Sequence, residues 1–184
     1  MHPILGKLQG GDRRSIGRSD EVVAQVLADP ALLAPLAEGL LADDPLVRMR
    51  AADALEKVTA QHPDWLQAHK ALLLGEAARL DQQEVRWHVA QMLPRLELSA
   101  GERARAVAIL RADLDHESRI VRAFALQALS ELADRDPAQR QEVLALLEEL
   151  SVTGCPAVRS RARKLLAEAK RRQQKGAGAN PAPG

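Results

Sequence analysis

The sequence is poor in cysteine and in aromatic residues. Its 184 residues include one Cys, two Trp, one Phe and no Tyr. The single Cys155 cannot form a disulfide within the chain, which excludes a disulfide-stabilised scaffold and leads us to expect a reducing, cytoplasmic compartment. Proteins that bind single-stranded nucleic acid stack bases on aromatic side chains, and an aromatic content of 2% offers almost no such platform.

Long apolar runs are also missing. The most apolar segment, residues 31–42, contains Glu38 and falls well short of the roughly 20 apolar residues that a membrane-spanning helix needs. Residues 1–15 carry Asp12 and three basic side chains without a continuous apolar stretch, so we expect no secretory signal. We therefore expect a chain that acts without a membrane.

Charge is balanced over the whole chain but not along it. Lys and Arg total 26 and Asp and Glu total 25, which gives a net charge of +1. Residues 156–175 hold eight basic side chains and one acidic one, so this segment carries +7 and the remainder −6. With 46% hydrophobic and 28% charged residues the chain can bury a core, which excludes wholesale disorder.

An internal repeat is the strongest signal in the sequence. The pair Val-Arg recurs with its valine at positions 47, 85, 121 and 158, at spacings of 38, 36 and 37 residues. The residues four, seven, eight and eleven positions after each valine are all apolar. At about 100° per residue these positions form one stripe about 100° wide, which predicts four amphipathic helices that each bury one face.

Capping signals and further helical stretches surround these four segments. Asp44-Pro45 and Ser118 suit the starts of the first and third helices, and Gly154 begins the turn into the fourth. Each repeated helix, here called a B helix, follows another helical stretch, here called an A helix. We expect A helices over residues 30–42, 64–80, 101–114 and 137–150, a capping helix over 20–28, an irregular arm over 1–19, a repeat domain over 20–170, and a disordered tail over 171–184 that is first basic and then rich in Gly, Ala and Pro.

Helix pairs with a period near 37 residues resemble HEAT repeats over residues 30–170. The likeness is strongest at Asp-Pro-Leu-Val-Arg-Met-Arg-Ala-Ala-Asp-Ala-Leu and at Ser-Arg-Ile-Val-Arg-Ala-Phe-Ala-Leu-Gln-Ala-Leu, and the second repeat departs from the pattern at Trp87, His88 and Pro94. The resemblance implies an all-α fold: a right-handed α-solenoid of about four helix pairs whose B helices line a concave face. The family serves many binding roles and implies no particular chemistry.

The resemblance also implies a ladder in which each B-helix arginine pairs with an acidic residue of a turn. The arginines are Arg48, Arg86, Arg122 and Arg159, and the candidate acids are Asp43, Asp44, Asp81, Glu84, Asp115 and Glu117. The turn before the fourth B helix has no acid. We therefore expect Arg159 to be the arginine that is free for a partner.

Residues two, three and six positions after each valine lie opposite the apolar stripe, on a surface called the groove from here on. A Trp or Phe beside Arg, His and amide groups is typical of an interaction hot spot, although packing of the Trp87 ring on the preceding A helix explains that residue equally well. An extended or helical segment with an acidic end near the fourth repeat would complement this surface. The predicted partner-binding residues are Met49, Arg50, Asp53, Trp87, His88, Gln91, Phe124, Gln127, Arg161 and Lys164.

No catalytic motif is present in the sequence. It has no G-x-x-x-x-G-K-[ST] phosphate loop, no H-E-x-x-H zinc helix and no G-x-S-x-G nucleophile elbow. Helical-repeat hydroxylases hold iron through repeated His-Glu pairs, whereas here His-Glu occurs once, at His116-Glu117. The sequence therefore predicts a noncatalytic protein, with no metal and no cofactor, that binds another protein in the groove.

The basic C-terminal helix suggests an alternative partner, a nucleic acid or another polyanion. Its cations encircle the helix and its apolar stripe is needed for the preceding repeat, which argues against a membrane-surface helix. The −6 of the remaining chain would repel a polyanion elsewhere, and a solvated cap that ends the repeat stack explains the same charges. The predicted polyanion-binding residues are Arg159, Arg161, Arg163, Lys164, Lys170, Arg171 and Arg172.

Overall fold

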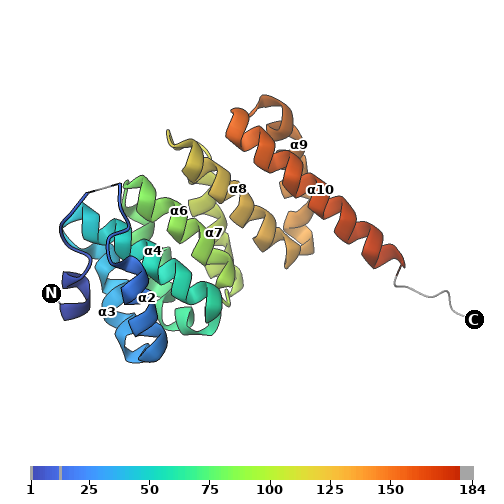
Figure 1. Cartoon of the computed structure of the whole chain (residues 1–184). Helices are drawn as coiled ribbons and strands as arrows, with labels where there is room; N and C mark the ends of the chain where they lie inside the picture. The colour runs from blue at the N-terminus through green and yellow to red at the C-terminus, as the bar shows by residue number, and fades with distance from the viewer. Residues whose placement is uncertain (1, 13, 179–184) are drawn as a thin grey trace, which may run out of the picture.

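Helices supply all of the regular secondary structure in the described part of the chain. A computed structural model gives the fold and describes residues 2–12 and 14–178, without the side chains of residues 173 and 175–178. Within those residues there is no strand, as predicted for an all-α chain (Figure 1). The elements are α1 (Pro3–Gly6), α2 (Ser19–Ala28), η1 (Pro30–Leu32), α3 (Leu33–Glu38), η2 (Gly39–Leu41), α4 (Pro45–Gln61), η3 (Pro63–His69), α5 (Lys70–Leu74), η4 (Ala77–Arg79), α6 (Gln83–Met92), η5 (Leu93–Arg95), α7 (Ala100–Asp113), α8 (Arg119–Asp134), α9 (Pro137–Thr153) and α10 (Pro156–Gly178).

The helices pack beside one another in chain order. The B helices are α4, α6, α8 and α10; α4 packs against both α2 and α6, and α8 packs against both α6 and α10. Among the A helices, α7 packs on α8, and α9 packs on α8 and α10. Figure 1 shows the progression from the blue N-terminal helices to the red α10. Successive B helices therefore lie side by side.

The predicted apolar stripe is buried. Its four valines, at positions 47, 85, 121 and 158, are at most 1% exposed, and every other stripe residue of the first three B helices is buried. In α10, Leu166 and Ala169 stay half-buried, because α10 packs against α8 and α9 and no described helix follows it. The periodicity of the sequence thus correctly identified the faces that the helices bury.

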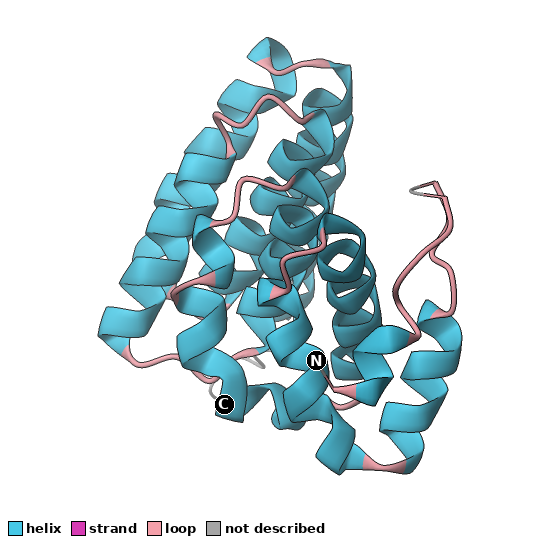
Figure 2. Cartoon of the chain, turned by 90° about the vertical axis from the view of Figure 1, so that its left-hand side faces the viewer, coloured by secondary structure: helices cyan, strands magenta, loops and turns pink. Residues whose placement is uncertain are grey.

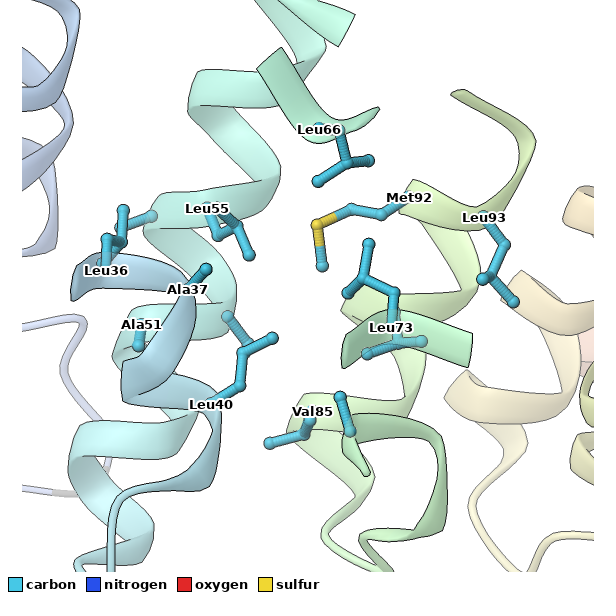
Figure 3. Close-up of a cluster of buried hydrophobic side chains, with 14 of the residues drawn as sticks. Leu36, Ala37, Leu40, Ala51, Leu55, Leu66, Leu73, Val85, Met92 and Leu93 are labelled. Carbon is cyan, nitrogen blue, oxygen red and sulfur yellow. The ribbon is translucent and has the colours of Figure 1, made fainter. Parts of the chain in front are cut away.

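The main core lies between the N-terminal and central helices. Figure 3 shows Leu55, Leu66, Leu73 and Met92 pointing into the space between α4, α5 and α6. Burying each such side chain stabilises the fold by about 1.5–3 kcal/mol. A second, smaller cluster joins α8, α9 and α10 through Leu126, Val143, Leu147, Val158, Ala162 and Leu165.

The first two A helices lie where they were predicted, over residues 30–42 and 64–80, but each is divided into short α and 3₁₀ segments. The first comprises η1, α3 and η2, and the second comprises η3, α5 and η4. Pro35 lies in the first turn of α3, where a missing N–H is tolerated, so the chain restarts a helix there. Gly39 then allows close packing, since a Cβ at this position would lie 2.6 Å from Cδ2 of Leu5 and 2.9 Å from Cβ of Ala51.

The remaining boundaries agree with the sequence except at the two ends. Helices α2, α7 and α9 match the predicted segments, and Pro94 ends α6. The irregular N-terminal arm contains one helical turn, α1, followed by loop residues 7–12 and 14–18, which are visible beside the helices in Figure 2. At the other end α10 continues to Gly178, so the tail does not begin at residue 171, because Lys, Arg, Gln and Ala are good helix formers. Residues 179–184 of the predicted tail lie outside the described residues.

None of the helices described combines the length and apolar character needed to cross a membrane.

Candidate functional site

A surface pocket of about 320 Å³ lies among the B helices α6, α8 and α10. We call it the groove pocket. Five of the predicted partner-binding residues line it: Gln91 from α6, Phe124 and Gln127 from α8, and Arg161 and Lys164 from α10. The structure therefore brings together side chains from three successive repeats that span more than 70 positions of the sequence.

Arg161 is held across the pocket by two neighbours. Its guanidinium carbon lies 5.5 Å from the centre of the Phe124 ring, within cation–π range, and its Nη1 donates to Oε1 of Gln127 at 3.0 Å. The amide nitrogen of Gln127 in turn donates to Oε1 of Glu131 at 2.6 Å. Phe124 packs against the main core with its ring only partly buried. These contacts preorganise a cation beside an apolar ring, which lowers the entropic cost of binding a partner.

Two charged groups of the groove pocket have no partner in the described part of the chain. Lys164 is exposed and Glu168 is half-buried, and neither side chain forms a hydrogen bond or an ion pair with described residues. By contrast Arg95 is bound, because its Nη1 donates to the Thr59 hydroxyl at 3.0 Å and its Nη2 pairs with Glu56. The pocket therefore offers Lys164 and the remaining donors of Arg161 to an acidic ligand.

The other groove residues that the sequence singled out do not line this pocket. Met49 is half-buried on α4, and Asp53 accepts from the Ser19 hydroxyl at 2.5 Å and from Lys57 at 2.9 Å. The rings of Trp87 and His88 lie 5.6 Å apart in a tilted arrangement, and both are half-buried. Trp87 is thus neither fully exposed, as expected for an interaction hot spot, nor fully buried, as expected for a ring packed on the preceding A helix.

Burial lowers the pKa of His88, and the charges around it act in both directions. Asp53 and Glu56 favour the protonated ring, whereas Lys57 and Arg95 oppose it. Desolvation is the largest effect, so the ring is held neutral more firmly than in water. A neutral His88 adds a hydrogen-bonding group, not a charge, to the face that carries Asp53 and Lys57.

Arg50 does not lie on the open groove, which corrects its predicted place among the partner-binding residues. Its side chain is 2% exposed and lies beneath the N-terminal arm. The guanidinium donates to four main-chain carbonyls of the arm, those of Leu8, Gly10, Asp12 and Ser15, at 2.7–3.1 Å. These carbonyls satisfy the buried cation in place of a carboxylate. No sequence pattern indicated this partnership, because the arm lies about 40 positions away from Arg50.

The arginine ladder finds partners other than the expected acids. Arg48 donates to Gln82 and to the carbonyls of Ala42 and Asp43, so no carboxylate takes part. Arg86 forms an ion pair with Asp113 of α7, in place of Asp81 or Glu84. Burial raises the pKa of Asp113, and the charge of Arg86 partly offsets that effect.

The last two ladder arginines have fewer partners. The Nε of Arg122 is buried without a hydrogen-bond acceptor. The side chain of Arg159 makes no hydrogen bond or ion pair with described residues, and it borders a shallow depression together with Pro156, Ser160 and Arg163. Arg159 thus has no side-chain partner among the described residues, and its contact with a binding partner stays a prediction.

The cations proposed for polyanion binding are spread around α10. Lys170 and Arg171 are exposed, the Nε of Arg163 donates to the Ser151 carbonyl at 3.2 Å, and Arg172 pairs with Asp134 at 3.2 Å. Arg161 and Lys164 instead face the groove pocket. These cations do not form one continuous stripe.

Sequence reasoning missed three charged residues of the groove pocket, although a signal for them existed. Arg95, Glu131 and Glu168 each lie ten positions after a repeat valine, one helical turn beyond the position-six residues. Including the residues ten positions after each valine in the groove would have found them. The partners of Arg95, in contrast, lie on the neighbouring helix α4 and leave no trace in its own repeat.

Among the described residues no group of three or more His, Cys, Asp or Glu side chains is placed to hold a metal ion. No protein-family model, curated protein or solved structure matches this chain.

Proposed function

We propose that this chain is a noncatalytic protein-interaction module, a right-handed α-solenoid of HEAT-like repeats that holds a partner protein in the groove. The observation that carries the proposal is the convergence of five predicted residues from α6, α8 and α10 on one pocket. The sequential packing of α2, α4, α6, α8 and α10 supports a solenoid, because in such folds each repeat contacts only its neighbours.

The partner we propose presents an acidic side chain next to an apolar one. Lys164 is an unpaired cation, and Arg161 has donors left beyond its bond to Gln127. The partly exposed Phe124 ring supplies the apolar contact beside them. An aromatic ring and an arginine at the centre of a polar-rimmed pocket are the residue types that carry most binding energy in protein interfaces.

The test is affinity capture from a native lysate with the wild-type chain and with the double variant Arg161→Glu/Lys164→Glu. We expect a partner that the wild type retains and that the double variant loses by at least about tenfold, because two charges facing an acidic segment are reversed. Quantitative mass spectrometry measures the retained proteins, and circular dichroism verifies the helical fold of each variant.

The matched control is Arg163→Glu/Lys170→Glu, which makes the same charge change on the same helix outside the groove pocket. The control should keep the partner. Equal capture by the wild type and the groove variant, or equal loss in both variants, would contradict binding in the groove.

A second candidate function is polyanion binding by α10. The observation that favours it is that the helix continues to Gly178, so Lys170 and Arg171 lie exposed on an ordered helix beside Arg163. Retention on heparin that falls steeply with salt and is weakened by Arg163→Glu/Lys170→Glu is the expected result. A wild-type chain that is not retained at low salt rejects this function.

A further inference from the structure

A second pocket, distinct from the groove pocket, lies between α8, α9 and α10. Its volume is about 360 Å³, which falls in the range of about 300–1,000 Å³ typical of small-molecule sites. The apolar part of the lining comes from Ala133 of α8, Val143, Leu144 and Leu147 of α9, and Ala169 of α10. We call it the apolar pocket.

On the α10 side the pocket is bordered by Ala169. Ala169 lies eleven positions after Val158, and the residue at the same place in the preceding repeat is Leu132. The pocket beside Leu132 has a similar volume, about 420 Å³, and its lining also holds two arginines and one carboxylate, Arg103, Arg135 and Glu97. The last repeat thus keeps the charged side chains and has the shorter alanine where the preceding repeat has leucine.

The α9 residues that line the pocket also differ from their counterparts in α7. Val143 and Leu147 line the apolar pocket, although both are largely buried. Their counterparts 37 positions earlier, Ala106 and Leu110, are fully buried and do not line the pocket beside Leu132. The last repeat therefore leaves open an apolar surface that the preceding repeat covers.

Ser130 places a hydroxyl at the wall of the apolar pocket. Ser130 of α8 is 5% exposed, lines the pocket, and forms no hydrogen bond with any described residue. A ligand oxygen in the pocket could therefore accept a hydrogen bond from the Ser130 hydroxyl.

Two arginines and one aspartate form the charged part of the lining. Arg172 pairs with the Asp134 carboxylate at 3.2 Å, and Arg140 donates to the main-chain carbonyl of Asp134 at 3.0 Å. The pocket therefore carries a net charge of +1 from these three side chains, and Arg140 has no carboxylate partner among the described residues. This charge favours an anionic head group over a cationic one.

We propose that the apolar pocket binds a small aliphatic carboxylate, with its chain against Val143, Leu147 and Ala169 and its head group beside Arg140 and Arg172. The proposal is independent of the function assigned to the groove pocket. The hydroxyl of Ser130 provides a further donor for a ligand oxygen, and the opposing Asp134 stays paired with Arg172.

The test is calorimetric titration of the full chain with sodium octanoate. We expect saturable binding, weakened at least about tenfold by Ala169→Leu, which fills the pocket, and unchanged by the control Ala167→Leu at an exposed position of the same helix. Octan-1-ol and octyltrimethylammonium, which lack the carboxylate, should bind at least about tenfold more weakly than octanoate.

Each alternative outcome overturns the proposal. No saturable binding to the folded wild-type chain, full affinity in Ala169→Leu, or equal affinity for octyltrimethylammonium would do so. If Ala169→Leu loses its helical circular dichroism, octanoate binding is measured instead with Arg140→Gln, a substitution at the exposed rim of the pocket. Undiminished octanoate affinity in Arg140→Gln contradicts the assigned head-group site. Sedimentation that shows a dimer lost in Ala169→Leu, without octanoate binding, would identify the occupant as a second copy of the chain.

Discussion

Gly17 lies directly against the guanidinium of Arg50. A Cβ built at Gly17 would stand 2.7 Å from Cζ of Arg50, and the backbone of Gly17 has φ = +57°, a conformation that favours glycine. The same guanidinium donates to four carbonyls of the arm. One buried cation and one glycine therefore hold residues 8–12 and 14–17 on the first B helix.

Replacing Gly17 by alanine should loosen this arm. The new Cβ would displace the Arg50 side chain, and the positive φ would strain the backbone, so we expect the free energy of unfolding to fall by about 1–3 kcal/mol. Urea unfolding followed by circular dichroism measures the change. Gly101→Ala is the control, since a Cβ at Gly101 meets no atom within 4 Å in α7. Equal stability of the two variants would contradict the arm contact.

Removing Arg86 should be costly because it leaves Asp113 buried without its ion-pair partner. The Asp113 side chain is 3% exposed, so we expect Arg86→Met to lower the free energy of unfolding by about 3–5 kcal/mol. The double variant Arg86→Met/Asp113→Leu should recover most of that loss, because no charge then stays buried. Thermal and urea unfolding of both variants give the comparison.

Arg48→Met is the matched control for the ladder. Arg48 donates to carbonyls and to Gln82 and has no carboxylate partner, so its loss should cost only about 1 kcal/mol. A loss at Arg48 as large as that at Arg86 would show that burial of Asp113 is not the dominant effect.

Acidification should weaken the fold through His88. Its pKa in the folded chain is lowered from the ordinary value of 6.5 by burial, so the unfolded chain takes up a proton first as the pH falls below 6.5. The contribution of His88 to stability is therefore complete above pH 6.5 and is lost as the pH falls through the folded pKa. We expect the urea midpoint to drop between pH 7.5 and 5.5, and His88→Gln to reduce that drop.

His69 is the comparison for this prediction. Its pKa is lowered by burial as well, against a favourable charge from Glu38. Because His88 is the more deeply buried ring, His69→Gln should reduce the acid-induced drop by less than His88→Gln does. An identical pH dependence in the wild type and in His88→Gln would refute the assignment.

Filling the apolar pocket should stabilise the protein even without a ligand. Ala169→Leu places apolar atoms against Val143 and Leu147, and cavity-filling substitutions of this kind typically add about 0.5–2 kcal/mol. Differential scanning calorimetry should show a higher melting temperature than for the wild type. Ala167→Leu, at an exposed position, should change the free energy of unfolding by no more than about 0.5 kcal/mol and leave the melting temperature nearly unchanged.

The candidate site was only partly predictable. The residues three and six positions after each valine fall on one face of every B helix, so Gln91, Phe124 and Arg161 could be assigned to a common surface from the sequence. Arg50 occupies the same position as Arg161 in its own repeat, three after the valine, yet it is buried. The difference arises because the N-terminal arm covers α4, whereas none of the described segments covers the corresponding face of α10.

The sequence by itself determined where the four B helices run and which faces they bury. Helical periodicity is a property of residues three to four positions apart, so an apolar stripe is visible without any knowledge of the neighbours. Only the tertiary structure decided that Arg50 binds the arm, that Arg86 pairs with Asp113, and that Ala169 borders an open apolar pocket. Those contacts join residues about 25 to 45 positions apart, and packing between helices, not local spacing, selects which of several chemically suitable partners meet.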